Sequence, residues 1–228
     1  MHSRPCKGGR LLLLRPSAKE AAHQIPNERA RADFVHARFG AFGVEPDEQC
    51  LALFVVAQIP LAVAGRVMAA ALEWAIHRYL FHVMGKRKGS MFAFHWKEHH
   101  RACRKVEMRD DAYVHGSLLD WRNGHAREIW AIVAACIAMS PGLLVVPGFV
   151  IGASYGGWRY HWCHRQSHLD PQWGKEKLRW HYDHHMAPNQ DTNWGVSNEW
   201  FDKWMGTRVP WAGPKKRTAN DGEDRAAK

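Results

Sequence analysis

The sequence predicts an all-α protein, a membrane-anchored helical bundle with a cytosolic, histidine-rich cap that holds a dimetal site. Two observations support this prediction. Charged residues are absent from Cys50 to Gly65 and again from Ile129 to Trp158, as expected for helices that lie in lipid. Histidines gather beside these apolar stretches at helical spacings, so several imidazoles can point to one place.

The length of 228 residues suits one sizeable core and is short for two. We expect a membrane domain over residues 50–210, a poorly ordered segment over residues 1–49 with a short surface helix near Glu28 to Phe39, and a polar tail over residues 211–228. The run from Leu11 to Leu14 is too short for the core of a signal peptide.

The charge balance favours an anionic lipid surface over a nucleic acid as partner. The chain has 32 Lys and Arg against 22 Asp and Glu, a formal charge of +10. The basic residues crowd the segments that follow the two uncharged stretches, which is the pattern of a membrane protein with basic segments on the cytoplasmic side. No zinc-finger, homeodomain or RNP-type pattern is present, which argues against a nucleic-acid reader.

The five cysteines are odd in number and never form C-x-x-C. This usage argues against a disulfide scaffold and against a thiolate zinc site. It is consistent with a reducing, cytoplasm-facing location for the polar part of the chain.

Eleven of the 16 histidines fall in two blocks, with the spacings H-x4-H and H-x3-HH, then H-x3-H and H-x2-HH. The blocks are His77, His82, His95, His99 and His100, then His161, His164, His168, His181, His184 and His185. Imidazole ligands suit Fe, Zn, Cu and Ni, and the supply exceeds what one ion can use. We therefore predict two metal ions. The single histidines, His2, His23, His36, His115 and His125, are interpreted as ordinary surface or loop residues.

The first block lies at the end of a predicted helix over residues 50–86 and on a second helix, FAFHWKEHHRACRK. Pro60 is expected to bend or divide the first helix, because it removes a donor. Arg66 and Glu73 are expected to face the protein interior, and Glu73 is a candidate to support His77.

Residues 106–127 are predicted to form an exposed connection, with Asn123-Gly124 as a turn. Asp110, Asp111 and Tyr113 could hydrogen-bond ligand histidines, although a solvated loop is the expected role. A straight helix over residues 129–158 would be roughly 45 Å long, beyond a hydrocarbon core of about 30 Å. Pro141-Gly142 and Pro147-Gly148 therefore predict a hairpin, which also returns the second block to the side of the first.

The second block begins on the helix that leaves this hairpin. His161, His164 and His168 share one face of it, and we favour His164 and His168 as ligands with His161 as a spare. Asp170-Pro171 should end this helix, and the helix with His181, His184 and His185 should begin near Lys175.

The order EWAIHRYLFH, HWKEHH, HRQSH and WHYDHH, followed by NWGV and WFDKWMGT, resembles the fatty acid hydroxylase and sterol desaturase superfamily of membrane di-iron, histidine-box proteins. The resemblance covers roughly Leu72 to Thr207. It implies a transmembrane bundle under a cytosolic cap with two Fe ions, for which zinc can substitute. Its chemistry is hydroxylation or desaturation of a lipid with O2.

Carried over position by position, the resemblance implies the metal ligands His77, His82, His95, His99, His100, His164, His168, His181, His184 and His185. Glu73, His161, Asp183 and Asn193 are candidates to support these ligands. The implied partners are a lipid substrate, most simply a fatty-acyl chain, the membrane, and an external electron donor of the ferredoxin or cytochrome b5 kind.

Three alternatives stay open. A carotenoid or sterol hydroxylase of the same superfamily would use the same ligands. A non-redox membrane metal-binding or transport protein would be expected to place histidines inside a spanning pathway. A di-zinc hydrolase would activate water rather than dioxygen.

Overall fold

A computed structural model describes residues 48–213, and every regular element within them is a helix. The all-α prediction is therefore confirmed. Contacts along the chain divide it into two compact units, Met1–Phe54 and Val55–Lys228. The described part of the first unit is residues 48–54. The predicted segment over residues 1–47, its surface helix and the tail beyond residue 213 lie outside the described residues.

The first long helix, α2 (Glu48–Ala75), runs through Pro60 without interruption and continues as the π-helix η2 (Ile76–Met84). The prediction that Pro60 could divide it is wrong. A proline removes one donor and displaces one carbonyl, and the turns on either side of Pro60 retain helical geometry. Arg66 and Glu73 both hydrogen-bond Ser197, so they face another part of the protein, as predicted.

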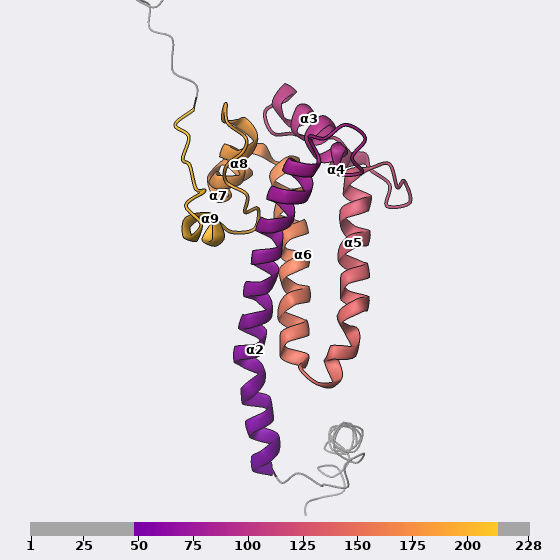
Figure 1. Cartoon of the computed structure of the whole chain (residues 1–228), viewed down its shortest axis with the longest axis vertical. Coiled ribbons are helices and arrows are strands. Elements are labelled where there is room, and N and C mark those ends of the chain that lie inside the picture. Colours follow the sequence, from indigo (N-terminus) through magenta and orange to yellow (C-terminus); the bar gives the residue numbers. More distant parts are fainter. Residues whose placement is uncertain (1–47, 214–228) are drawn as a thin grey trace, which may run out of the picture. The chain divides into compact units, whose positions relative to one another are not determined.

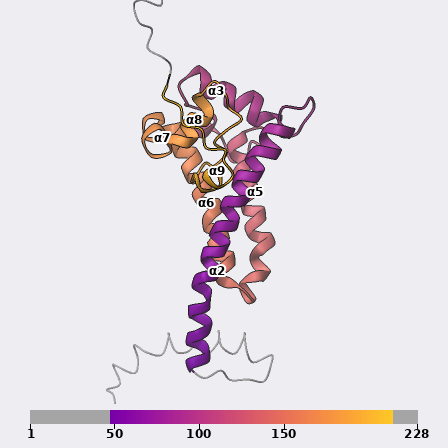
Figure 2. The same ribbon diagram turned by 60° about the vertical axis from the view of Figure 1, so that its left-hand side comes forward.

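The predicted hairpin is confirmed. Helix α5 (Gly124–Met139) leads through the 3-10 turn η4 (Ser140–Leu144) into α6 (Pro147–Leu169), and the two helices run side by side in Figures 1 and 2. Pro147 stands at the first position of α6, where its missing N–H leaves no intrahelical bond unmade. The hairpin brings the second histidine block back beside the first.

Helices α2 and α6 approach each other through glycines. A Cβ atom on Gly152 would lie 2.0 Å from the carbonyl oxygen of Ala62, and one on Gly148 would lie 2.3 Å from that of Gln58. Gly148, Gly152 and Gly156 are spaced four residues apart, so they form one face of α6. Such small-xxx-small spacing allows two helix backbones to pack closely, above all in membranes. This signal for the α2–α6 contact was missed in the sequence.

The remaining helices form the cap, at the end of α5 and α6 away from their hairpin turn (Figures 1 and 2). They are η3 (His95–His99), α3 (His100–Lys105), α4 (Ala112–His115), α7 (Pro171–Lys177), α8 (Arg179–Met186) and α9 (Trp200–Trp204). Imidazoles are prominent among the largest fully buried side chains. The interior of the cap is therefore polar, and its stability depends on how those rings are satisfied.

Three predicted boundaries are corrected. The triplet helix α8 begins at Arg179 rather than near Lys175, because a separate helix, α7, begins at Pro171 with the Asp170 carboxylate accepting from the Trp173 N–H. Asn123-Gly124 is the start of α5 rather than a free turn, since the Asn123 side chain caps the helix by accepting from the backbone N–H of His125. The polar tail is anchored at Trp211, whose N–H donates to Asp183.

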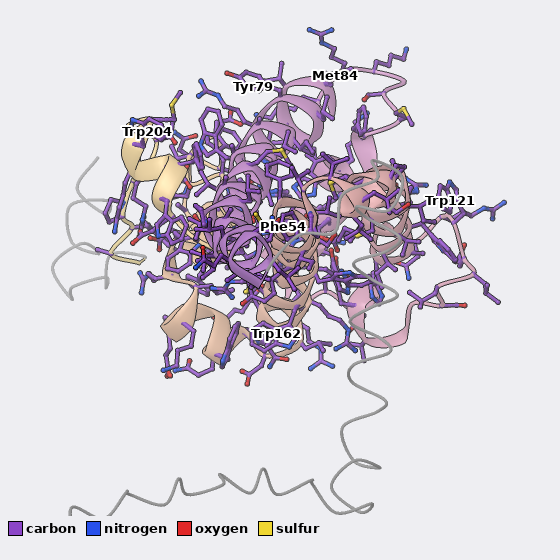
Figure 3. All side chains as sticks on the ribbon, turned by 90° about the horizontal axis from the view of Figure 1, so that it is seen from below. Phe54, Tyr79, Met84, Trp121, Trp162 and Trp204 are labelled. Carbon is purple, nitrogen blue, oxygen red and sulfur yellow. The ribbon has the colours of Figure 1, made fainter. Side chains whose placement is uncertain are left out.

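Two helices are long and apolar enough to cross a membrane, Gln49–Met84 and Gly124–Leu144. Few of the residues in their most apolar windows are buried by other parts of the described chain, 6% in the first and none in the second. Their large apolar side chains, such as Ile59, Val63 and Ile137, are exposed. Viewed along the helices, Trp121, Trp162 and Trp204 lie at the outer edge of the structure (Figure 3).

Replacing Gly152 by alanine should destabilise the protein by about 1–3 kcal/mol, because the new methyl group meets the backbone of α2 rather than a movable side chain. Gly157→Ala is the matched control on the same helix, because a Cβ there makes only ordinary contact with Ile132, at 3.4 Å. It should leave stability unchanged or raise it by up to about 1 kcal/mol through helix propensity. Unfolding of both full-length variants in detergent measures the difference, and equal stabilities would contradict the close α2–α6 contact.

Candidate metal centre

The structure brings all ten predicted ligands together as buried side chains. Their potential ligand atoms form one group from η2, η3, α3 and α8 and two overlapping groups from η3, α3, α6 and α8, each with atoms within 4.8 Å of one another. The first group is His77, His82, His95, His100 and His184; the others are His99, Cys103, His168 and His185, and His164, His168, His181 and His185. We call the five-histidine set the first group, and the other two sets, which overlap, together the second group. These buried groups could bind metal ions.

Local π-helical structure explains the spacings of the first block. On an α-helix, residues five apart are separated by about 140° around the axis, so His77 and His82 would diverge. In a π-helix the hydrogen bond joins residues i and i+5, which places such residues nearly above one another. Both η2 and η3 are π-helical, so His77 lies near His82, and His95 near His100, with ring centroids 5.2 and 4.9 Å apart.

The first group is oriented by the loop that follows α8. Nδ1 of His184 donates to the carbonyl oxygen of Thr192 at 2.7 Å, and Nδ1 of His77 donates to that of Trp194 at 2.6 Å. Nδ1 of His82 lies 3.2 Å from a carboxylate oxygen of Asp191. Each bond occupies the nitrogen that faces away from the cluster, so Nε2 is the ligand atom in these rings.

The same loop is held in place by buried polar side chains. Asn193 has a positive φ of 58°, and its side-chain oxygen accepts from the backbone N–H of Val209 at 2.8 Å. Asp202 is fully buried and accepts from the N–H groups of Trp194 and Gly195 at 2.8 and 2.7 Å. Asn193 therefore supports two ligands through the carbonyls of its neighbours, Thr192 and Trp194, rather than through a direct contact.

Glu73 acts on this loop as well. It makes no hydrogen bond to His77; its carboxylate accepts from the backbone N–H of Ser197 at 2.8 Å and from the Ser197 hydroxyl at 2.6 Å. Asp183 points away from the ligands and is bonded to Arg179 and Arg208, at 2.7 and 3.1 Å. The ion pair between Asp183 and Arg208 thus connects α8 to the segment that follows α9.

The second group is oriented by two carboxylates and a carbonyl. Nδ1 of His99 donates to Asp110 at 2.6 Å, Nδ1 of His164 to Glu128 at 2.8 Å, and Nδ1 of His168 to the carbonyl oxygen of Met108 at 2.6 Å. Carboxylate–histidine pairs of this kind fix the ring and raise its basicity as a ligand. His161 belongs to none of the groups that could hold a metal ion, and its Nδ1 lies 3.2 Å from the other oxygen of Glu128.

The connection over residues 106–127 was predicted to be exposed, and for five of its described residues this is wrong. Asp110 and Tyr113 are buried, and the Tyr113 hydroxyl lies 2.9 Å from Nδ1 of His164. Asp111 is exposed, as predicted, and pairs with Arg109. His125 is buried too, stacked on His161 with ring centroids 5.1 Å apart, rather than an ordinary surface residue.

The ligand nitrogens converge too closely for hydrogen bonding alone. Nε2 of His100 lies 3.1–3.2 Å from the Nε2 atoms of His82, His95 and His184. One ring nitrogen has a single proton or a single lone pair, so it cannot satisfy three such neighbours. At a metal–nitrogen length of about 2.1 Å, ligands at right angles have nitrogens about 3 Å apart. The donor set therefore fits an imidazole-bound metal ion.

The second group shows the same mismatch. His99 and His164 both donate through Nδ1 to carboxylates, and their Nε2 atoms face each other at 3.2 Å. Two neutral rings, the form that binds metals, would oppose their lone pairs in this arrangement, whereas a protonated His99 would donate to His164. Both ring nitrogens of His185 and Nδ1 of His181 are buried without a hydrogen-bond partner among the described residues. A cation is the simplest partner for one nitrogen of each of these rings.

Protonation of most of these rings is disfavoured. Burial, followed by the neighbouring imidazoles, holds the pKa of His95, His100, His181 and His185 well below the usual range, and burial lowers the pKa of His184 to about 4. Neutral imidazole is the form that binds metals. His99 is the exception: burial opposes its protonation, but Cys103 and Asp110 outweigh this and raise its pKa to about 9.

Sequence reasoning missed several supporting groups. Glu128 is the last charged residue before the uncharged run, which was a usable signal. Asp191 follows the triplet within one loop, and Cys103 lies 3.4 Å from Nδ1 of His168. The carbonyl groups of Met108, Thr192 and Trp194 carry no signal in a sequence, because every residue has one.

Comparison with known proteins returned no match, whether to family models, to curated proteins or to solved structures.

Removing bound metal should lower the melting temperature of the full chain by about 10 °C or more, since metal-binding free energy contributes directly to folding when ligands come from several elements. The comparison is between protein as purified and protein treated with a chelator, both with measured metal content. Re-addition of the metal should restore the transition. An unchanged melting temperature in verified metal-free protein would contradict a metal-stabilised cap.

Asp110→Asn should weaken metal binding at the second group by about 10- to 100-fold. Asparagine can still accept from the N–H of Ala112 but presents an NH2 group to His99, which favours the tautomer with the proton on Nε2. Asp111→Asn is the matched control, because Asp111 is exposed and touches no ligand. Competition with a chromophoric chelator measures both affinities; equal values would contradict the role of Asp110.

Proposed function

We propose that the protein is a membrane-bound di-iron oxygenase that hydroxylates or desaturates a lipid, most simply a fatty-acyl chain, using O2 and electrons from a separate donor. It would belong with the fatty acid hydroxylase and sterol desaturase superfamily that its histidine motifs resemble. The observation that carries the proposal is the ten-histidine cluster, in two adjacent groups, with a large apolar pocket against one side of it.

This pocket has a volume of about 560 Å³ and is lined mainly by apolar side chains, Phe81, Met91, Phe92, Phe94, Trp121 and Trp130 among them. His95 of the first group and His164 of the second also line it. An apolar molecule in the pocket would thus lie against one ligand candidate of each group. We name it the substrate pocket.

A second cavity, of about 250 Å³, lies among α2, α5 and α6 and shares Phe81, Glu128, Ala131 and Tyr160 with the substrate pocket. The rest of its lining is largely Ala, Gly, Leu, Ile and Met side chains. The two cavities are neighbours, with Glu128 in their shared lining, and we propose that a substrate extends from one into the other. A long hydrocarbon chain can lie along both cavities with its reactive carbon at the histidine end.

The membrane setting rests on the exposure of apolar side chains. The windows that make Gln49–Met84 and Gly124–Leu144 long and apolar enough to span a bilayer are almost unburied, and lipid is the environment in which such surfaces are stable. Exposed tryptophans on the cap side, such as Trp200 and Trp204, suit the interface between lipid and water. In this setting the cluster lies just beyond the bilayer, on the basic, cytoplasmic side.

Bound iron supplies the dioxygen chemistry, which no side chain can perform. In a hydroxylation, one O2, two electrons and two protons convert a C–H bond into C–OH and release one water molecule. The chain's own residues orient six of the ten rings through contacts of their Nδ1 atoms. They also exclude water with the aromatic wall of Phe81, Phe92 and Phe94, and align the substrate. Position along the two cavities would decide which C–H bond reacts.

The test is metal analysis and turnover of the full chain purified from native membranes. We expect about two irons per chain and O2-dependent conversion of lipid in the presence of an electron donor. His184→Ala should lose at least half of the iron and lower turnover by more than about 100-fold. His125→Gln is the control, because His125 is buried but lies outside both metal groups.

The alternatives predict different results in the same experiment. Tightly held zinc with hydrolytic turnover indicates a di-zinc hydrolase, and bound metal without turnover of any lipid indicates a metal-binding or transport protein. Lipid profiles of cells with and without the protein separate fatty-acyl substrates from carotenoids and sterols. Full activity of His184→Ala would remove the basis of the proposal.

A further inference from the structure

A second large recess lies on the cap and is basic rather than apolar. It measures about 580 Å³ and is lined by Trp96, Lys97, His100, Arg101, Arg104, Lys105 and Gln190. Four of these seven residues are cationic and none is acidic. We name it the basic recess. It shares no lining residue with the substrate pocket.

The positive charges of the basic recess are uncompensated. Lys97, Arg101 and Lys105 form no ion pair within residues 48–213, and they recur every four residues along η3 and α3, so they form one stripe. Arg104 donates to the carbonyl oxygen of Ala187 at 2.9 Å, which fixes its side chain without neutralising it. A stripe of this kind attracts an acidic partner and accelerates its association.

The floor of the basic recess is a metal-ligand candidate. His100 lines the recess, and its Nε2 atom lies 3.2 Å from that of His184 within the first group. Trp96 lines the recess as well, with its ring centroid 5.3 Å from His100 and 5.0 Å from His82. Aromatic rings in contact therefore connect the recess to the first group, with one imidazole between solvent and the metal position.

The position of the basic recess argues against a lipid headgroup as its natural occupant. It lies over α3, at the end of the structure opposite the hairpin turn of α5 and α6 (Figure 1). The apolar helix surfaces that suit lipid lie below the cap. With the bilayer around those helices, the basic recess faces the aqueous phase, where a soluble protein can reach it.

We propose that the basic recess is the docking site for a small acidic one-electron carrier protein, and that electrons enter the first metal group through His100 and Trp96. The inference rests on the proposed function, since an oxygenase needs an external reductant. Each docking event oxidises the carrier by one electron and reduces the metal centre by one. Two events, with two protons from water, supply what one turnover consumes.

The experiment compares the full chain in nanodiscs with two charge-reversal variants. Lys97→Glu/Lys105→Glu alters the basic recess, and Lys175→Glu/Lys177→Glu makes the same charge change on exposed residues of α7. Binding of a plant-type [2Fe–2S] ferredoxin and of the soluble domain of cytochrome b5, both acidic, is measured at several salt concentrations. Binding of vesicles with anionic lipid and of inorganic phosphate is measured in parallel.

We expect at least one carrier to bind in a salt-sensitive manner, and the recess variant to weaken that binding by about tenfold or more while the α7 variant stays within about twofold. Electron transfer from the reduced carrier should slow in proportion. Reduction by dithionite should be unchanged in the recess variant, with metal content as in the wild type. That combination assigns the defect to docking rather than to folding or to the metal groups.

Equal loss in both variants, or loss of vesicle or phosphate binding alone, overturns the docking site. So does the absence of salt-sensitive binding to either carrier. A protein that binds the carrier through the basic recess but holds zinc and shows no O2 consumption would keep the docking site and overturn the oxygenase instead, so the two failures are distinguishable.

Discussion

Each imidazole in the cluster has two nitrogens, and in six of the ten rings a contact of Nδ1 with an oxygen atom directs Nε2 towards the centre of the cluster. Oxygen atoms of Asp110, Glu128 and three backbone carbonyls accept from the outward Nδ1–H groups, which leaves lone pairs on Nε2 pointing inward. The inward nitrogens then approach to 3.0–3.3 Å. A buried polar atom without a partner costs about 1–3 kcal/mol, and the cap has few apolar side chains with which to offset a cluster of them. A cation at the centre of each group removes that cost, so the polar interior of the cap and its capacity for metal have one physical origin.

This arrangement requires two distant parts of the chain to meet within tenths of an ångström. Helix α2 leads into η2, which carries His77 and His82, and α6 carries His164 and His168. The backbones of α2 and α6 lie in contact because Gly148 and Gly152 have no side chain to separate them. The loop after α8 provides a second connection to α2. The Asp202 carboxylate accepts from the backbone N–H of Trp194 in this loop, and Trp74 on α2 donates to the same carboxylate at 3.2 Å. A ligand on α8 and a ligand on η2 are thus oriented by one loop. A small shift of α2 would therefore change the orientation of both ligands.

The candidate ligands could be predicted because the spacing of histidines is visible in the sequence. The groups that hydrogen-bond those histidines could not, because they are brought close only by the tertiary structure. The spacing of His181, His184 and His185 predicted one helix that points three rings at one place. Helix α8 carries all three, but His184 joins the first group while His181 and His185 join the second. The π-helical turn that joins His77 to His82 could not be predicted from propensity, because the spacing alone is compatible with two diverging rings. The exposed-loop prediction for residues 106–127 failed at Asp110, since a carboxylate in a polar loop looks the same in sequence whether it faces water or a histidine. The hairpin of α5 and α6 was predictable because length and proline–glycine pairs constrain it directly.

The substrate pocket and the basic recess reach the histidine cluster from different surroundings. In the proposed reaction a hydrocarbon chain and an electron carrier must both reach the same pair of metals, and they need opposite surroundings: the first an apolar wall without water, the second an aqueous, charged face. The substrate pocket meets the cluster at His95 and His164, and the basic recess meets it at His100. Because the linings are separate, a carrier can dock while the lipid stays bound and water stays excluded from it. In the proposed reaction, electrons can therefore arrive while the substrate is in position, through a face of the cap that the substrate does not occupy.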